Sequence, residues 1–392
     1  LATAIQYLRW LEAEGHDVAD AARRIGFVFT ADADQFLTIA KLRAARVLWG
    51  RALAAMGLQA EPAVIHIETA ARMMAKRDPH VNLLRTTTAA FAAGVGGADA
   101  VTALPFTAAL GLPDGFARRL ARGLQVMLQE ESGIGRVGEA AAGAGFVEAA
   151  TTELAGVAWA SFQAIEAQGG MLAGLASGFM QGQIAEAAAM RRLAVAERRM
   201  RLTGVSQFPK LDEVDIDVLN VPLPEGWQSG PLGGAIACTP LAQERMAAPF
   251  EALRDAADAV FRRSGQRPAV FLANLGLLAE YDARTRWVRN LFAAGGIAAL
   301  GTEGFDSPEA AARAFRDSGA PVACLCGSER GYGELGAATA EALREAGALR
   351  IYAAGHPGEL EGVGVDEFLF EGIDVVAALE RLHDVLEVRP TP

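Results

Sequence analysis

The sequence predicts a mixed α/β protein with parallel sheets, and two observations support that prediction. Short apolar runs alternate with longer amphipathic stretches, which is the order produced when helices connect parallel strands. The chain is 52% hydrophobic but only 7% aromatic, and this composition suits helices packed closely on parallel strands. Its 392 residues are enough for two or three domains, each with its own core.

The first part of the chain predicts three strand–helix units. The expected strands are Arg24–Thr30, Ala63–Glu68 and Ala100–Leu104. A helix capped by Asp32 or Asp34 follows the first strand, a helix or loop over 78–94 the second, and a helix over 114–132 the third. Three parallel strands leave apolar edges open, so another segment of the polypeptide or a partner chain is expected to complete the sheet.

Apolar spacing predicts which faces of these helices are buried. For the helix after the first strand, the predicted inner face is Phe36, Ile39, Ala40, Arg43 and Val47. For the helix over 114–132 it is Phe116, Leu120, Leu124, Met127 and Leu128.

The middle of the chain predicts helices and then a connector. Helices are expected at Phe146–Ala167 and Met171–Met200. Prolines and glycines then interrupt residues 206–265, which reads as a linker closed by a helix over Pro249–Arg263. We therefore predict a first domain over 1–145, a helical extension over 146–205, the linker over 206–265 and a last domain over 266–392.

The last domain predicts a doubly wound, flavodoxin-like sheet whose ligand lies outside the carboxyl ends of the strands. The expected strands are Ala269–Ala273, Ile297–Leu300, Val322–Cys326, Arg350–Ala353 and Glu367–Phe370. Helices are expected near 282–294, 307–318, 332–346 and 375–386, with Ser307 capping the second of them.

Charge and cysteine content exclude several classes of protein. A net charge of −11 argues against a nucleic-acid or anionic-membrane surface. Cys324 and Cys326 lie two apart in an apolar run and are expected to be core thiols, as in a reducing, cytoplasmic protein. The sequence begins at Leu1, and we expect it to be the later part of a longer product. His16 and His383 are expected at the surface.

Six segments resemble methylmalonyl-CoA mutases in collinear order. They are ADQFLTIAKLRAAR (Ala33–Arg46), RDPHVNLLRTTTAAFAAGVGGADAV (Arg77–Val101), ALGLPDGFARRLARG (Ala109–Gly123), LQEESGIGRV (Leu128–Val137), GGMLAGL (Gly169–Leu175) and TGVSQFP (Thr203–Pro209). The resemblance implies that the first domain is the later part of a (β/α)8 TIM barrel for acyl-CoA and that the last domain has the cobalamin-binding fold. It also implies an isomerase that interconverts methylmalonyl-CoA and succinyl-CoA with adenosylcobalamin.

At the expected barrel mouth, this sequence departs from catalytic members of the family. Those members resemble His-x-Gln-Thr-Ser-Gly after one strand, where this chain keeps His66 and Thr69 but has Glu68 and Ala70. After the next strand, Leu104 and Ala108 replace an Asn and a Glu that face the adenosyl ribose. His66 and Glu68 are predicted to be remnants of a substrate contact, with a purely structural role for His66 as the alternative.

The expected cobalamin loop departs further. Family domains that bind cobalamin carry Asp-x-His-x-x-Gly after the first strand, and these three positions align with Leu278, Glu280 and Ala283. A carboxylate is a poor substitute for imidazole on a transition metal, and Leu offers no hydrogen bond to orient a ligand. Cys326-Gly327-Ser328 and Ala354-Gly355-His356 stand where two supporting motifs are expected. His356 follows the fourth strand rather than the first, which disfavours it as a cobalt ligand.

The combined losses favour a non-catalytic small subunit of a heterodimeric mutase. Such a chain has no catalytic residue, no metal and no cofactor of its own, while a large catalytic subunit binds adenosylcobalamin and acyl-CoA. Two alternatives stay open at this point. In the first, the chain is a catalytic acyl-CoA mutase with altered cobalamin binding. In the second, it is a stand-alone acyl-CoA-binding or regulatory module.

Overall fold

The computed structural model describes residues 1–59, 61–220, 238–360 and 362–388, and its chain divides into two compact units. Unit 1 comprises residues 1–188 and 215–245, and unit 2 comprises residues 189–214 and 246–392. Each unit contains a parallel sheet with helical connections, so the predicted mixed α/β class is confirmed. The central part of the predicted linker, 221–237, lies outside the described residues, and the four-part domain division stays a prediction.

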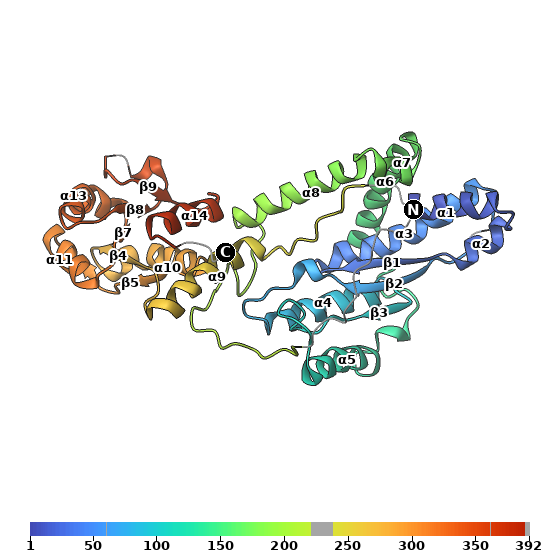
Figure 1. Cartoon of the computed structure of the whole chain (residues 1–392), viewed down its shortest axis with the longest axis horizontal. Coiled ribbons are helices and arrows are strands. Elements are labelled where there is room, and N and C mark those ends of the chain that lie inside the picture. Colours follow the sequence, from blue (N-terminus) through green and yellow to red (C-terminus); the bar gives the residue numbers. More distant parts are fainter. Residues whose placement is uncertain (60, 221–237, 361, 389–392) are drawn as a thin grey trace. The chain divides into compact units, whose positions relative to one another are not determined.

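Unit 1 is built on a three-stranded sheet in the order β1-β2-β3, with all neighbours parallel (Figure 1). Its strands are β1 (Gly26–Ala31), β2 (Val64–Thr69) and β3 (Ala100–Thr102). Its longer helices are α1 (Ala2–Ala13), α3 (Gln35–Ala55), α4 (Val81–Val95), α5 (Gly115–Glu130), α6 (Gly145–Ala167) and α8 (Phe179–Ala196), the last of which extends into unit 2. Shorter helices are α2 (Val18–Arg24), η1 (Ala71–Met73), η2 (Ile134–Arg136) and α7 (Met171–Ala176).

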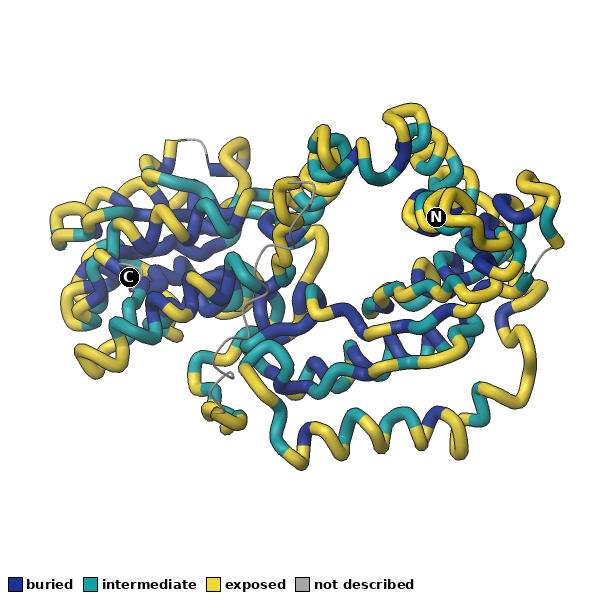
Figure 2. The backbone as a smooth tube through the Cα atoms, turned by 45° about the vertical axis from the view of Figure 1, so that its right-hand side comes forward, coloured by how far each residue is buried: buried dark blue, intermediate teal, exposed yellow. Residues whose placement is uncertain are grey.

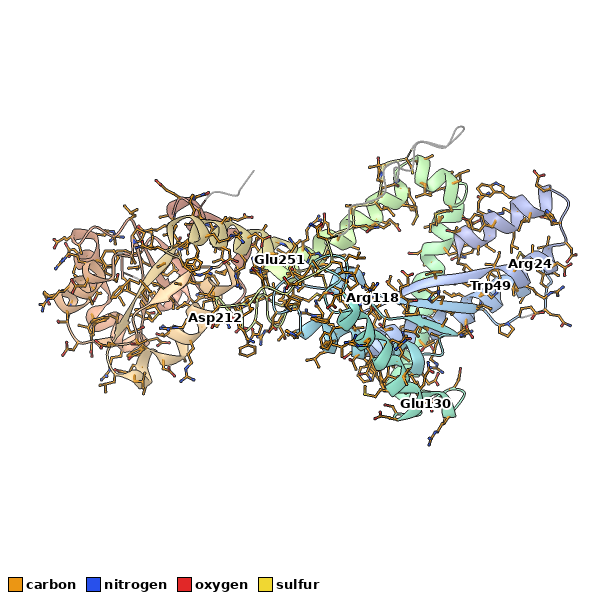
Figure 3. The ribbon with its side chains drawn as sticks, turned by 60° about the horizontal axis from the view of Figure 1, so that its bottom comes forward. Arg24, Trp49, Arg118, Glu130, Asp212 and Glu251 are labelled. Carbon is orange, nitrogen blue, oxygen red and sulfur yellow. The ribbon has the colours of Figure 1, made fainter. Side chains whose placement is uncertain are left out.

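The residues that the structure describes cover only one face of this sheet. Alternate residues of β2, Ile65 and Ile67, are fully buried beneath the helices, and Trp49 of α3 meets Phe27 of β1 edge-on at 5.2 Å between ring centroids (Figure 3). On the opposite face Val28 is 66% exposed and Val64 is 55% exposed. Successive strand residues point to opposite faces, so this alternation means that half of the sheet surface is open in the described chain.

Several predictions for unit 1 need correction. The two helices before β1 are not predicted from the sequence, and the expected helix over Met171–Met200 is broken into α7 and α8 at Gly178, whose φ is +82°. Asp34, rather than Asp32, caps α3 by accepting a hydrogen bond from the Leu37 N–H at 3.1 Å.

The predicted inner faces of two helices are only partly buried. In α3, Ile39 and Ala40 are buried, whereas Phe36 and Val47 are more than half exposed. In α5, which carries Arg118 near its beginning and Glu130 at its end, only Ala117 and Leu128 are buried (Figure 3). Apolar periodicity identifies a face that could be covered, and in the described chain part of that face has no cover.

Unit 2 is a sheet in the order β5-β4-β7-β8-β9, in which β6 also pairs with β4. The strands are β4 (Ala269–Leu275), β5 (Ala298–Leu300), β6 (Gly304–Phe305), β7 (Val322–Cys326), β8 (Arg350–Ala354) and β9 (Glu367–Leu369). The helices are α9 (Ala248–Ser264), α10 (Leu278–Ala294), α11 (Pro308–Ser318), α12 (Glu329–Gly331), η3 (Tyr332–Gly336), α13 (Ala337–Glu345), η4 (Pro357–Glu359) and α14 (Val375–Val385).

This second sheet is enclosed on both faces. Helices α11 and α13 pack against each other on one face, and α9, α10 and α14 form the layer on the other. Every residue of β7 is buried, including Cys324 and Cys326, which are core thiols as predicted. Figure 2 shows buried backbone running through the interior of unit 2. Parallel sheets are stable when both faces are covered, and unit 2 has a second layer of cover that the described part of unit 1 does not provide.

In each sheet, an aspartate just before an edge strand accepts a backbone N–H of the neighbouring strand. Asp99 precedes β3 and accepts the Ile65 N–H of β2 at 2.7 Å, while Asp366 precedes β9 and accepts the Ile351 N–H of β8 at 2.7 Å. An arginine from the helix before the neighbouring strand pairs with each carboxylate, Arg46 of α3 at 3.0 Å and Arg344 of α13 at 3.3 Å. A strand amide that the short edge strand cannot reach is thereby satisfied.

His383 of α14 lies in the core of unit 2, so the expectation that it is a surface residue is wrong. It is 4% exposed, and its Nε2 lies 2.8 Å from the carbonyl oxygen of Gly295 at the end of α10. Burial lowers the pKa of His383, although the contact with the carbonyl opposes that shift. The apolar spacing of α14 was an available signal, because His383 falls eight residues after Val375 on the face of Ala378, Leu379 and Leu382.

We expect His383 to make the stability of unit 2 depend on pH. Its pKa in the folded chain lies below the unfolded value of roughly 6.5, so the neutral form stabilises the fold above that pH and the contribution is lost as pH falls. Urea unfolding at pH 8 and pH 5.5 should therefore show a smaller loss of stability on acidification in His383→Gln than in the natural sequence. At pH 8 the variant should be less stable by roughly 1 kcal/mol through the altered hydrogen bond. An equal acid sensitivity of the two proteins would contradict this assignment.

Candidate functional site

The carboxyl edge of the unit 2 sheet is the place where a doubly wound fold binds its ligand. The turn after β4 consists of Gly276, with φ +84°, and Leu277, after which α10 begins at once with Leu278. The sequence predicts that this helix starts near Asp282, so the expected cofactor loop is in fact its first turn. Leu277 and Leu278 are 74% and 63% exposed, and neither offers a polar group to a ligand.

Glu280 is fully engaged in closing this turn. One carboxylate oxygen accepts the Leu277 N–H at 2.8 Å, and the other lies 2.6 Å from the Arg330 guanidinium on α12, after β7. The Leu277 amide and Arg330 both lower the pKa of Glu280, the amide more strongly, so the residue is held as a carboxylate. It therefore caps α10 and links two neighbouring turns.

The gap between the ends of β7 and β8 is filled by a tyrosine. Tyr332 is 2% exposed, and its hydroxyl lies 3.0 Å from the Leu325 carbonyl oxygen and 2.8 Å from the Ala354 carbonyl oxygen. The Arg284 guanidinium lies 5.2 Å from the centre of its ring. Burial raises the pKa of Tyr332 far above its ordinary range, so this hydroxyl is a proton donor to carbonyls and not an acid.

Gly355 and His356 continue this edge after β8. A side chain at Gly355 would meet Arg284 and Leu360, each 3.1 Å from the position of its Cβ, so there is no space beside this glycine for a further group. His356 is exposed, its Nδ1 accepts the Gly358 N–H at 3.3 Å, and its ring lies against Phe370 at 4.8 Å. The imidazole thus caps a short helix.

The residues at this edge do not fit a cobalt-binding loop. Glu280 stands at the position of the expected metal ligand, and its two oxygens already contact the Leu277 amide and the Arg330 guanidinium. Ala283 is an ordinary residue within α10, so its backbone is no more open to a ligand than that of any other helical residue. Among the residues that the structure describes, no group of three or more His, Cys, Asp or Glu side chains is arranged to hold a metal ion.

Asn274 and Thr285 are polar residues that the sequence reasoning missed. Asn274, near the end of β4, is fully buried and donates to the Glu303 carbonyl at 3.1 Å, while Thr285 of α10 donates to its side-chain oxygen at 2.6 Å. An amide inside an otherwise apolar strand was the available signal. Both polar ends of the Asn274 amide are satisfied within the fold, so the pair fixes α10 against β4.

The second predicted site lies on the open face of the unit 1 sheet. His66 sits in the middle of β2, and its Nε2 lies 2.9 Å from the Thr102 hydroxyl of β3. Glu68 is exposed two residues further along the same face and is in register with Thr30 and Thr102. The structure therefore places His66 and Glu68 on one surface, together with hydroxyl groups, and their role as substrate contacts stays a prediction.

The two apolar replacements at this site lie on the loop after β3. The Leu104 N–H donates to the Thr69 hydroxyl at 2.8 Å, and Leu104 itself is only partly buried. Ala108 follows in the turn that its own N–H closes on the Pro105 carbonyl at 3.0 Å. Neither side chain can pair with a sugar hydroxyl.

Comparison with known proteins gives one family throughout. A family model described as methylmalonyl-CoA mutase matches residues 1–257. The methylmalonyl-CoA mutase small subunit of Streptomyces virginiae is 46% identical over 389 residues, covering 99% of this chain and 61% of the relative. The small subunit of Propionibacterium freudenreichii subsp. shermanii is 37% identical, covering 99% of this chain and 60% of that relative. The chain therefore spans about 60% of the length of these curated relatives.

A relative not named as a small subunit matches a shorter stretch. The methylmalonyl-CoA mutase of Cereibacter sphaeroides is 35% identical over 224 residues, covering 56% of this chain and 32% of the relative.

Replacement of Tyr332 tests whether it holds the edge between β7 and β8 closed. Tyr332→Phe removes a hydroxyl that is bonded to buried carbonyls and should lower the free energy of unfolding by about 1 kcal/mol. Tyr332→Ala also leaves a cavity and should cost about 3–5 kcal/mol. Urea denaturation followed by circular dichroism measures both values. Equal stabilities of the Phe and Ala variants would show that the ring does not fill this space.

Proposed function

The chain belongs to the methylmalonyl-CoA mutase family, and from that premise we propose that it is the non-catalytic, structural subunit of a two-subunit mutase. The large subunit of that enzyme would hold adenosylcobalamin and acyl-CoA and would interconvert methylmalonyl-CoA and succinyl-CoA. The observation that carries the proposal is the environment of Glu280. Glu280 stands at the position of the expected metal ligand and has a carboxylate in place of an imidazole. One carboxylate oxygen accepts the Leu277 N–H, and the other pairs with Arg330.

The two folds support the same proposal. We infer that the β1-β2-β3 sheet is the later part of a TIM barrel, because its strands are parallel, its helices lie on one face and its other face is open. We infer that unit 2 is flavodoxin-like, because, with β6 set aside, its strand order corresponds to 2-1-3-4-5. Additional strands, from a preceding segment or from the partner, would complete the first sheet.

The open face of unit 1 would then be an inherited acyl-CoA site without its chemistry. His66 and Glu68 remain on that face, whereas Leu104 and Ala108 cannot pair with a ribose. Each polar group of a ligand left unpaired there would cost roughly 1–3 kcal/mol of binding.

No helix in the described part of the chain is both long and apolar enough to cross a bilayer.

Cobalamin binding tests the proposed function directly. The chain is purified alone and together with a catalytic mutase subunit, adenosylcobalamin is added, and the visible spectrum is recorded after gel filtration. We expect no cobalamin on the isolated chain and one cobalamin per heterodimer in the complex, because only the partner supplies a ligand. Stoichiometric cobalamin on the isolated chain would favour an active mutase, whereas acyl-CoA binding to that chain without any complex would favour a stand-alone module.

Restoring the motif residues alone should not restore binding. In the triple variant Leu278→Asp, Glu280→His and Ala283→Gly, the imidazole is regained, but Tyr332 and Leu360 still occupy the edge of the sheet. The same spectra should show no stoichiometric cobalamin on this variant, with the natural sequence as control. Tight binding by the triple variant would mean that the three side chains, and not the filled edge, are what exclude the cofactor.

A further inference from the structure

Unit 2 contains a cavity that is separate from the carboxyl-edge turn of β4. It has a volume of about 310 Å³ and is lined by residues of three segments, all within unit 2. The segment 197–208 follows α8, the middle of α10 contributes Trp287 and Asn290, and the loop from β9 to α14 contributes Phe370 and Glu371. Ligand pockets start near 300 Å³, so the cavity suits a small molecule.

Most charges around the cavity are neutralised in pairs. Arg201 lies 3.1 Å from Glu371, and Arg286 forms a bridge with Asp282 at 2.8 Å. Glu197 is held by Arg199 at 2.6 Å. Arg198 also lines the cavity, and among the described residues its guanidinium forms no salt bridge with a carboxylate.

Arg198 contacts only neutral groups. Its Nη2 donates to the side-chain oxygen of Gln207 at 3.1 Å and to that of Asn290 at 2.9 Å, and its guanidinium lies 6.0 Å from the centre of the Trp287 ring. Its Nη1 is buried and has no hydrogen-bond partner in the described chain. Burial lowers the pKa of Arg198 most strongly and the neighbouring Arg201 lowers it further, while the carboxylate of Glu371 opposes that shift, so the guanidinium is a partly desolvated cation.

The backbone of Arg198 is also unusual. Its φ is +57°, at the position just past the end of α8, where the Arg198 N–H reaches the Val195 carbonyl. Glycine is the common residue there because a side chain in this conformation is strained by roughly 1 kcal/mol or more. The fold therefore tolerates strain at the residue that brings a guanidinium into the cavity.

We infer that this cavity binds a small oxyanion, a carboxylate or a phosphate group, with Arg198 as its principal donor. An arginine presents parallel N–H groups that match either anion, and a desolvated one gains most from an acceptor. Gln207 and Asn290 hold the guanidinium in place through Nη2, whereas the buried Nη1 is a donor that has no partner in the described chain and would gain one from an anion. Trp287, Phe208 and Phe370 give the cavity apolar walls for the remainder of the molecule. This inference does not rest on the proposed function.

Anion titration of the full chain tests the site. Sodium phosphate, acetate and benzoate are added at constant ionic strength, and the indole signal of Trp287, assigned with Trp287→Phe, is followed by nuclear magnetic resonance. We expect a saturable shift. Tighter binding of phosphate identifies a phosphate ligand, whereas tighter binding of benzoate than of acetate identifies a carboxylate on an apolar group. Absence of a saturable shift with all three anions overturns the proposal.

Three variants separate binding from folding. Arg198→Gly should weaken binding at least tenfold while leaving the unfolding midpoint unchanged or higher, because glycine relieves the positive φ. Glu371→Gln should tighten binding at least twofold, because Arg201 is then also available to the anion. Arg313→Gln, an exposed arginine of α11 outside the cavity, is the matched control and should change neither. Unaltered binding in Arg198→Gly, or an equal loss in Arg313→Gln, would refute the site.

Discussion

A parallel sheet needs cover on both faces and a neighbour along each edge, and unit 1 meets only part of that requirement. Its helices bury Ile65 and Ile67, but Val28 and Val64 on the other face are more than half exposed in the described chain. Unit 2 differs because the whole of β7 is buried between two helical layers. The two sheets therefore differ in how far the described residues cover them, although both are parallel and both have helical connections.

The carboxyl edge of unit 2 is held together by side chains of unit 2 itself. A sheet of this topology has its crevice between the carboxyl ends of β4 and β7, and the buried carbonyls at the ends of β7 and β8 also need hydrogen-bond partners. Here the Tyr332 hydroxyl bonds carbonyls from both strands, and Glu280 joins the turns after β4 and β7. Side chains of the fold itself thus supply partners for the polar groups at this edge.

The sequence predicted the order of strands and helices well because periodicity and capping are local properties. Val322–Cys326 is a strand with the predicted bounds, and Ser307 caps α11 as expected. The inner faces of α3 and α5 were harder to predict, since burial of Phe36 or Phe116 depends on a neighbour that need not be local. Likewise, the residues near His383 in the sequence do not indicate its hydrogen-bond partner in the core. That partner is the carbonyl of Gly295, 88 positions away.

The candidate sites were predicted unevenly for a related reason. Resemblance located Glu280 as a position without its metal ligand, but the sequence could not show that its carboxylate caps α10 and binds Arg330. It gave no indication of the Arg198 cavity, because that wall combines three segments separated by more than 70 residues and depends on one unusual φ. A departure from a family pattern is visible in a sequence because the pattern itself provides the reference. A site that belongs to this chain has no such reference, so it becomes visible only when a buried guanidinium is found with one donor nitrogen unpaired.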